Sequence, residues 1–403
     1  MREQWGFSSA GEMVFGSNAV RRLGEKLDKN NLGSVILCTD PGVSRAGLLE
    51  PAVESLKESD IAYEVFEQGE PEPSVEIVNK AYEWAKNKKY DGIIGLGGGS
   101  SIDLAKALAV MLSFGGPVEQ YFGEGKLPDK PKPIIAIPTT AGTGSSVTSA
   151  SVLTDTKANL KIGISDNRLR PSLALVDPLL TLTCPPYLTA CTGIDVLAHA
   201  IEAYTAISYQ YLPLSPEEEQ TVIYHGANPL ADNLALQAIS LVGQNLRLAV
   251  DQGSNIEART NMALANIAAG MAFSNAGVTA VHAMAYPLGA YSHAPHGLVN
   301  GLLLPHVLEY NLPVCTPQLA QAARCLGQQT QGLSEREAAM KTITAIRELI
   351  KDIGLPSKMR EIGIKEEHLR PMAEATLKVT RLLRSNPRKI SADDLENIFK
   401  QAY

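Results

Sequence analysis

The chain has 403 residues, 45% of them hydrophobic and 20% charged, with a formal net charge of −7. This is the composition of a globular protein long enough for two or three domains, and the acidic balance argues against nucleic acid as a partner, because phosphate binding requires a basic face. An uninterrupted apolar run of about eighteen residues is absent, and so is the apolar segment of a signal peptide, so we expect no membrane partner.

Short β-branched runs alternate with helical patterns through the first half of the chain, which predicts a parallel, doubly wound sheet. From about residue 185 onwards, Ala- and Leu-rich helical patterns replace the strands. We therefore predict an α/β domain with a parallel sheet in residues 1–184, followed by an all-α domain in residues 185–403. The clearest predicted strands are 34–40, 61–67, 91–100 and 133–140.

A glycine-rich turn follows the third of these strands and precedes a helical pattern. It reads Gly97-Gly98-Gly99-Ser100-Ser101. Glycines let backbone N–H groups approach a phosphate closely, and a helix N-terminus carries a partial positive charge. The turn lacks both the GxGxxG spacing and the lysine of a P-loop, so a tight turn without a ligand is an equally good interpretation of this motif alone.

A second polar turn follows the next strand. Its residues Thr139, Thr140, Thr143 and Ser145 offer hydroxyls and free N–H groups without charge. Two such turns at the ends of two strands of one sheet suit a dinucleotide lying in the crevice of the sheet.

Asp40 ends the first clear strand. An acidic residue there accepts hydrogen bonds from ribose hydroxyls and repels a 2′-phosphate, which favours NAD over NADP. The alternative interpretation is a turn aspartate before Pro41-Gly42, which is a common turn sequence. The sequence does not choose between the two.

The second half contains a candidate metal site. Asp195 and His199 lie four residues apart in a helical pattern and so share one helix face, and His282 and His296 lie in a stretch, 278–305, without Lys, Arg, Asp or Glu. Three imidazoles and a carboxylate suit Fe(II), Zn(II) and other divalent transition metals. The competing interpretation of Asp195 and His199 is a weak surface pair.

These segments resemble the signature blocks of the iron-containing (group III) alcohol dehydrogenases, and the resemblance extends from about Phe15 to the C-terminus. It implies a dinucleotide-binding α/β domain, a helical metal-binding catalytic domain and a metal in the cleft between them. It also implies NAD(P)-dependent oxidation of alcohols or reduction of aldehydes. The blocks are GGGSSIDLAKA, PTTAGTGSS, GIDVLAHAIEAY and VHAMAYPLGAYSHAPHGLVNGLLLPHV.

The resemblance assigns roles to individual residues. The family's metal ligands fall on Asp195, His199, His282 and His296; His293 is a competing ligand, but the fourteen-residue spacing from His282 favours His296. The cofactor residues that the resemblance implies are Asp40 as the determinant of NAD preference, Gly97, Gly98, Gly99, Ser100 and Ser101 at the pyrophosphate, Asp103 near the nicotinamide, the loop residues Thr139, Thr140, Thr143 and Ser145, and Lys161 at the ribose.

The sequence departs from the family pattern in three places, of which one is Ser146, where relatives frequently carry Glu. Many relatives carry a histidine four residues after the third ligand, where this chain has Tyr286; a phenol is a poor base near neutral pH, so we expect Tyr286 to be a pocket wall or a hydrogen-bond donor. The segment 208–229 looks longer than in short relatives, as in a loop that covers an active site, and we expect its His225 to lie on the surface.

We therefore expect a cytoplasmic, NAD-dependent alcohol dehydrogenase with one divalent metal per chain, Fe(II) ahead of Zn(II), acting as a homodimer or larger homo-oligomer. The metal polarises the alcohol or carbonyl oxygen, and hydride is exchanged with nicotinamide. The five scattered cysteines suit a reducing compartment, and the uncharged stretch 278–305 favours a small neutral substrate. The alternatives are a maleylacetate-reductase-like enzyme, a dehydroquinate-synthase-like lyase and a non-catalytic metal- and nucleotide-binding scaffold.

Overall fold

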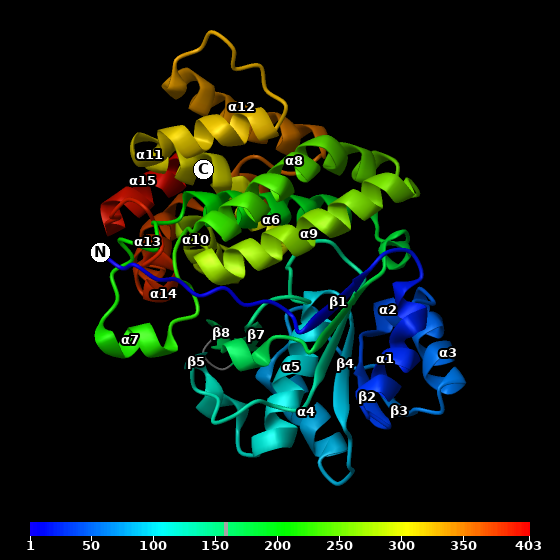
Figure 1. Cartoon of the computed structure of the whole chain (residues 1–403). Helices are drawn as coiled ribbons and strands as arrows, with labels where there is room; N and C mark the ends of the chain where they lie inside the picture. The colour runs from blue at the N-terminus through cyan, green and yellow to red at the C-terminus, as the bar shows by residue number, and fades with distance from the viewer. Residues whose placement is uncertain (157–159) are drawn as a thin grey trace. The chain divides into compact units, whose positions relative to one another are not determined.

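The structure is a computed structural model that describes residues 1–156 and 160–403, and its chain divides into two units (Figure 1). The sheet unit comprises Ser8–Cys184 together with Gln220–Ile223. The helical unit comprises Met1–Phe7, Pro185–Glu219 and Tyr224–Tyr403. The N-terminal seven residues thus belong with the helices, although 177 residues of the sheet unit separate them in sequence from Pro185.

The centre of the sheet unit is a six-stranded sheet in the order β1-β9-β6-β4-β2-β3. Every neighbouring pair in it is parallel, which confirms the predicted α/β class with a parallel sheet. Its strands are β1 (Glu12–Phe15), β2 (Ser34–Cys38), β3 (Ala62–Phe66), β4 (Gly92–Gly97), β6 (Ile134–Pro138) and β9 (Leu173–Val176).

Helices cover both faces of this sheet, and the alternation of side chains along the strands shows it. On β2, Val35 and Leu37 join the core that contains residues of α1 and α3, whereas Ile36 and Cys38 join the core of α4 and α5. Strands buried on both faces are expected to be apolar at every position, as SVILC is after its first residue. The helices are α1 (Leu23–Lys29), α2 (Pro41–Arg45), α3 (Glu50–Glu58), α4 (Val75–Ala85) and α5 (Gly99–Phe114).

A second sheet of three strands was not expected from the sequence. Its strands β7 (Ala150–Asp155) and β8 (Leu160–Ser165) pair antiparallel, and β5 (Gly123–Glu124) pairs with β8. The sequence analysis also did not predict β1 and β9. Of these strands, β1, β5 and β9 have only two to four residues, and runs this short give periodicity little to distinguish them from loops.

No strand follows β9 in the described residues, so the predicted helical second half is confirmed. Helices α6, α8 and α9 pack side by side (Figure 1). No single described helix is long and apolar enough to cross a membrane; α9 and α10 pass that test only as a pair bent by 103°. The helices are α6 (Pro186–Thr205), α7 (Pro216–Thr221), α8 (Pro229–Asp251), α9 (Ile256–Ala276), α10 (Ala280–Ser292), α11 (His296–Cys325), α12 (Glu335–Asp352), α13 (Leu369–Leu377), α14 (Thr380–Leu383) and α15 (Ala392–Ala402).

The segment 208–229 is not a plain loop. It contains α7, and an isolated bridge joins Ser208 to Ala227 near its two ends. The expectation that His225 lies on the surface is wrong, because this residue is half-buried and its backbone N–H donates to Asn275. A histidine in a polar segment looks exposed in sequence, but here the chain returns against the end of α9.

Candidate metal and cofactor sites

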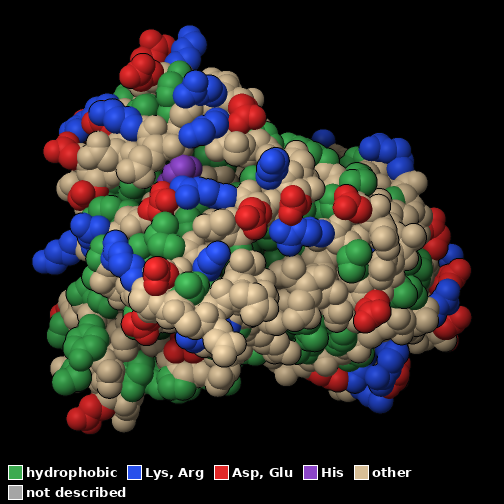
Figure 2. All heavy atoms as spheres, turned by 90° about the horizontal axis from the view of Figure 1, so that it is seen from above, with side chains coloured by type: hydrophobic (Ala, Val, Ile, Leu, Met, Phe, Trp, Pro, Cys, Tyr) green, Lys and Arg blue, Asp and Glu red, His purple; other side chains and the backbone are tan. Residues whose placement is uncertain are grey.

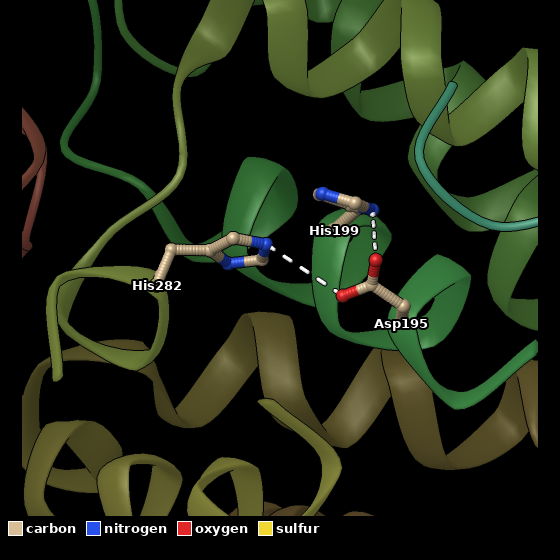
Figure 3. Close-up of side chains that lie close together, drawn as sticks. All are labelled: Asp195, His199 and His282. Carbon is tan, nitrogen blue, oxygen red and sulfur yellow. Dashed lines mark ion pairs between the residues drawn. The ribbon is translucent and has the colours of Figure 1, made fainter. Parts of the chain in front are cut away.

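Three of the expected metal ligands form a tight buried group. Asp195 and His199 lie one turn apart on α6, and His282 comes from the first turn of α10. The carboxylate of Asp195 faces both imidazoles (Figure 3), with its oxygens 3.9 Å from Nδ1 of His199 and 3.8 Å from Nε2 of His282. One ligand atom from each residue lies within 4.8 Å of the others, and all three residues are buried.

His296 lies beside this group rather than inside it. It is the first residue of α11 and is half-buried, and its ring centroid is 5.4 Å from that of His282. The competing candidate His293 is exposed and ends α10 in a left-handed conformation with a φ of 53°.

Two residues that the sequence analysis missed support the group. Glu202, two turns after Asp195 on α6 and 1% exposed, accepts a hydrogen bond from Nδ1 of His282. Glu202 also accepts from the backbone N–H groups of Thr279 and Val281, both at 2.9 Å. A carboxylate on Nδ1 fixes the tautomer whose Nε2 lone pair is free to bind a metal.

Asn300 is the second missed residue. It is fully buried one turn after His296, and its Nδ2 donates to Oδ1 of Asp195 at 2.7 Å. The same nitrogen lies 3.1 Å from Nε2 of both His282 and His296. Asn300 therefore contacts three of the four expected ligands. The only feature of the sequence that points to these residues is their helical spacing from the ligands: Glu202 follows Asp195 by seven residues, and Asn300 follows His296 by four.

Electrostatics keep the carboxylate of this group ionised. Burial alone would raise the pKa of Asp195, but the neighbouring charges of His199, His296 and His282 bring that pKa below its ordinary value. Burial likewise works against protonation of His282, and the charge and hydrogen bond of Glu202 outweigh it and raise the pKa.

Aromatic contacts hold His199 in place. Its ring stacks on Phe273 with centroids 4.1 Å apart and planes inclined by 12°, and it also stacks on His282 at 4.5 Å. The imidazole thus contacts two rings, which restricts its rotation.

A glycine allows α11 to approach α6 at the site. A Cβ atom on Gly297 would lie 2.0 Å from the carbonyl oxygen of Cys191 and 2.9 Å from Cβ of Asp195. No side chain fits there. Gly297 directly follows His296, so the close approach brings that histidine next to α6.

The glycine turn lies where the sequence analysis placed it. β4 ends at Gly97, and α5 begins at Gly99, with Gly98 as its N-cap. Gly97 has a φ of +149°, which side-chain-bearing residues rarely adopt, and a Cβ on Gly99 would lie 2.6 Å from the hydroxyl of Thr143. The turn thus needs glycine for its conformation and for contact with the second turn.

The structure joins the two expected cofactor turns. The N–H of Thr139 donates to the carbonyl of Gly97 at 2.9 Å. The hydroxyl of Ser145 donates to Oδ1 of Asp103 at 2.5 Å, and the N–H of Ser145 donates to Thr143 at 3.2 Å. Residues 42 positions apart in sequence therefore form one polar surface at the ends of β4 and β6.

The contacts of Asp40 agree with its interpretation as a turn residue. They do not test its expected role in selecting NAD over NADP. Its Oδ1 accepts from the N–H groups of Gly42 at 2.7 Å and Val43 at 3.1 Å, which caps α2. Its Oδ2 accepts from the hydroxyl of Ser101 at 3.3 Å. Asp40 therefore caps α2 with one carboxylate oxygen and contacts the glycine turn with the other.

Lys106 is a buried charge that the sequence analysis missed. It is 0% exposed, and its ammonium donates to the hydroxyl of Ser145 at 3.0 Å and to the carbonyls of Thr148 and Ala150 at 3.1 and 2.7 Å. Burial lowers its pKa to about 8, partly offset by Asp103. Lys106 thus ties α5 to the second turn and to β7. The feature of the sequence that could have identified Lys106 is its position three residues after Asp103 within an otherwise apolar helix.

Two further residues were expected at the cofactor and metal sites, Lys161 and Tyr286. Lys161 lies on β8, and its ammonium pairs with Glu72 at 2.5 Å. Tyr286 lies one turn after His282 on α10 and is half-buried.

A parallel sheet with polar turns at the ends of its strands, together with a buried carboxylate–imidazole group in a helical unit, defines the class of metal-dependent dehydrogenases. Comparison with known protein families gives the same class. The profile of the family described as iron-containing alcohol dehydrogenase matches residues 10–178, and that of the Fe-containing alcohol dehydrogenase family, C-terminal, matches residues 219–403. The chain belongs to the iron-containing alcohol dehydrogenase family.

Individual relatives match over almost the whole chain. The 1,3-propanediol dehydrogenase of Citrobacter freundii is 40% identical over 391 residues, 96% of each chain. The NAD-dependent methanol dehydrogenase of Bacillus methanolicus is 34% identical over 389 residues, 96% of this chain and 97% of the relative. A crystal structure of a 1,3-propanediol oxidoreductase has a TM-score of 0.93 at 38% identity and covers 100% of both chains.

Proposed function

We propose that this chain is an NAD-dependent alcohol dehydrogenase and aldehyde reductase that holds one divalent metal ion on Asp195, His199, His282 and His296. The observation that supports this proposal most directly is the buried group of ligands. Glu202 binds Nδ1 of His282, and Nε2 of the same ring faces the carboxylate of Asp195. Buried charges and imidazoles of this kind require a partner. The donor set suits both Fe(II) and Zn(II), and the description of the matching family as iron-containing favours Fe(II).

A divalent ion and NAD at these sites supply a Lewis acid for the substrate oxygen and an acceptor for hydride. The residues of the chain prepare that chemistry. Glu202 orients His282, Phe273 and His282 contact the ring of His199, and Asn300 holds the carboxylate of Asp195. Tyr286, one turn from a ligand, contributes a pocket wall or a hydrogen bond to the substrate.

We assign cofactor binding to residues 1–184 and metal binding to residues 185–403. In this assignment the turn Gly97–Ser101 receives the pyrophosphate at the N-terminus of α5, and Asp40 selects NAD over NADP. The continuity of the two turns supports it, because Thr139 and Ser145 bond to Gly97 and Asp103. The remaining assigned residues are Thr140 and Thr143 in the second turn and Lys161 at the ribose.

We propose a small neutral alcohol or aldehyde as the substrate. The absence of Lys and Arg from residues 278–305 supports this, and so do the names of relatives that act on 1,3-propanediol and methanol. We also propose a cytoplasmic homodimer or larger homo-oligomer; none of the five cysteines forms a disulfide in the structure, as suits a reducing compartment.

The test combines metal analysis with turnover. Protein loaded anaerobically with Fe(II) should reduce NAD, followed at 340 nm, with primary alcohols and diols, and should do so less well with NADP. His282→Ala should lose bound metal and nearly all turnover, because three ligands hold the ion less tightly. The matched control is His293→Asn, which changes an exposed histidine of the same segment at a left-handed position that asparagine tolerates.

Three outcomes would refute parts of the proposal. Stoichiometric metal and full turnover in His282→Ala would show that the ligand assignment is wrong. Turnover confined to acidic hydroxy compounds in the same panel would favour a maleylacetate-reductase-like enzyme instead, and binding of metal and NAD without turnover would favour a scaffold.

A further inference from the structure

The helical unit contains a cavity of about 1220 Å³, lined by residues of α11, α12 and α15, by the segment 354–361 and by Arg388. It lies away from the metal ligands in sequence: His306, which lines it, follows His296 by ten residues on α11, or about 15 Å along a helix. The apolar part of its lining consists of Leu302, Pro305, Ile350, Leu355 and Ile398.

His306 is a buried polar residue of the lining, and one of its two ring nitrogens has no hydrogen-bond partner in the described residues. It is 7% exposed, and its buried Nδ1 makes no hydrogen bond in the described residues. Oε2 of Glu309 lies 3.9 Å from Nδ1, and Glu309 is itself paired with Arg347 at 2.8 Å. Buried polar groups in proteins are rarely left unsatisfied. Burial, with the charges of Arg347 and Lys358, lowers the pKa of His306 to about 4, so the ring is neutral at physiological pH.

The acidic residues of the lining already have partners. Glu309 pairs with Arg347. Glu361 accepts from the backbone N–H groups of Ser357 and Lys358 at 3.1 and 2.7 Å. Asp394 accepts from the N–H and the hydroxyl of Ser391 at 2.9 and 2.6 Å, as the capping box of α15.

The cations of the lining other than Arg347 are not neutralised by an ion pair among the described residues. Within the described part of the chain, no carboxylate forms an ion pair with Lys351, Lys358 or Arg388, although the charge of Arg388 contributes to lowering the pKa of Asp394. Lys358 donates to the carbonyl of Gln401 at 3.3 Å. Arg388 donates to the carbonyl of Tyr310 at 2.6 Å and stacks on its ring at 4.1 Å. With Arg347 these cations outnumber the three carboxylates of the lining by one, so the cavity carries net positive charge. The face of the molecule drawn in Figure 2 carries side chains of both signs.

We propose that this cavity is a binding site for a small organic anion, with its apolar part on Leu302, Ile350 and Ile398 and its carboxylate or phosphate group facing Lys351, Lys358 and Arg388. His306 supplies a neutral hydrogen-bonding group to the same ligand. Concave sites that combine an apolar lining with a few convergent polar groups are typical of small-molecule binding. The site is additional to the metal and cofactor sites, and it does not depend on the proposed activity.

The test is calorimetric titration of the metal-loaded protein, saturated with NADH, at constant ionic strength. The probes are hexanoate and hexyl phosphate, which share an apolar chain and differ in the anionic group; hexanamide is the neutral control. At least one anion should bind once per chain and hexanamide should not. Because Lys351→Ala with Lys358→Ala removes charge-assisted hydrogen bonds to the anion, the double substitution should weaken binding by about tenfold or more.

Matched variants separate the cavity from general charge effects. Lys341→Ala with Lys365→Ala removes the same charge outside the cavity lining and should leave the affinity unchanged. His306→Phe keeps an aromatic ring without its nitrogens and should weaken binding while the alcohol activity persists. The proposal is overturned if neither anion binds, if hexanamide binds as well as hexanoate, or if both double variants bind alike.

Discussion

At the scale of single residues, each buried charge lies where several donors or acceptors converge on it. Glu202 receives hydrogen bonds from Thr279, Val281 and His282. Lys106 donates to Ser145, Thr148 and Ala150. A buried ion without such partners costs several kcal/mol, so these networks can form only when distant segments are in place together.

Asp40 is the residue whose two roles an experiment can separate. Asp40→Asn retains an oxygen that caps α2 and removes the negative charge beside the glycine turn. The ratio of kcat/KM for NADP to that for NAD should therefore rise by about tenfold, since the charge that repels a 2′-phosphate is gone. Steady-state kinetics with both cofactors measure the ratio. An unchanged ratio with unchanged stability would leave Asp40 as a helix cap alone.

Lys106 should give the sheet unit a characteristic dependence on pH. Its pKa is about 8 in the folded chain, against an ordinary value of 10.5. Between these values the folded protein has released the proton and the unfolded chain has not, so the unfolded state binds more protons and stability rises with pH. Relative to Lys106→Met, the free energy of unfolding should rise by up to roughly 3 kcal/mol across this window.

Unfolding of the sheet unit can be followed by itself. The chain has two tryptophans, Trp5 in the helical unit and Trp84 in the sheet unit. In a Trp5→Phe background the fluorescence of Trp84 reports denaturant unfolding around α4. If the stability difference between the chain with Lys106 and the Lys106→Met variant stays constant or shrinks with rising pH, the lowered pKa of Lys106 is contradicted.

At the scale of elements, the metal site depends on how closely α11 approaches α6. Gly297 and Gly301 both face α6, where an added Cβ would lie 2.0 Å from Cys191 and 2.8 Å from Ile194. Small residues of this kind set the separation of two helices, and the separation places His296 relative to Asp195.

Gly297→Ala tests this contact. The added methyl group has no space, so the helices must move apart, which typically costs about 1–3 kcal/mol. We expect a lower thermal midpoint and weaker metal binding, measured by calorimetry and by metal analysis after dialysis. Gly289→Ala on α10 is the control, because an added Cβ there meets nothing within 4 Å and alanine favours helix. Equal effects of both substitutions would argue against a role for close approach.

At the scale of the whole molecule, each unit carries one of the proposed sites, with metal ligands on α6, α10 and α11 and cofactor residues around β4 and α5. A ligand stabilises the segments that hold it. Hydrogen exchange read by mass spectrometry should therefore show faster exchange in α6, α10 and the start of α11 after chelation of the metal. NADH should slow exchange in residues 97–101 and 139–146.

The segments in which hydrogen exchange changes show whether each site has been assigned to the right unit. Chelation that changes exchange only in the sheet unit, or NADH protection confined to α6 and α10, would mean that the two sites have been assigned to the wrong units. His282→Ala provides the control, since its exchange should not respond to chelation.

The sequence by itself determined the fold class and the identity of most candidate residues. Alternating apolar strands and helical patterns are local signals, and they predicted β2, β3, β4, β6 and the helical second half. Asp195 and His199 share a helix face by spacing alone, and the glycine turn stands between a strand and a helix in the sequence itself. Strands of two to four residues, such as β1, β5 and β9, were missed because so few residues carry too little periodicity.

Only the tertiary structure decided which residues support those candidates. Glu202, Asn300 and Lys106 look like ordinary helix residues in sequence, and each has a side-chain partner 39 to 105 residues away. The proximity of His282 to Asp195, the contact between the two cofactor turns and the unsatisfied Nδ1 of His306 likewise depend on packing between segments. Local patterns report the period of a segment and the chemistry of its side chains, whereas a buried polar contact exists only once separate elements have packed around it.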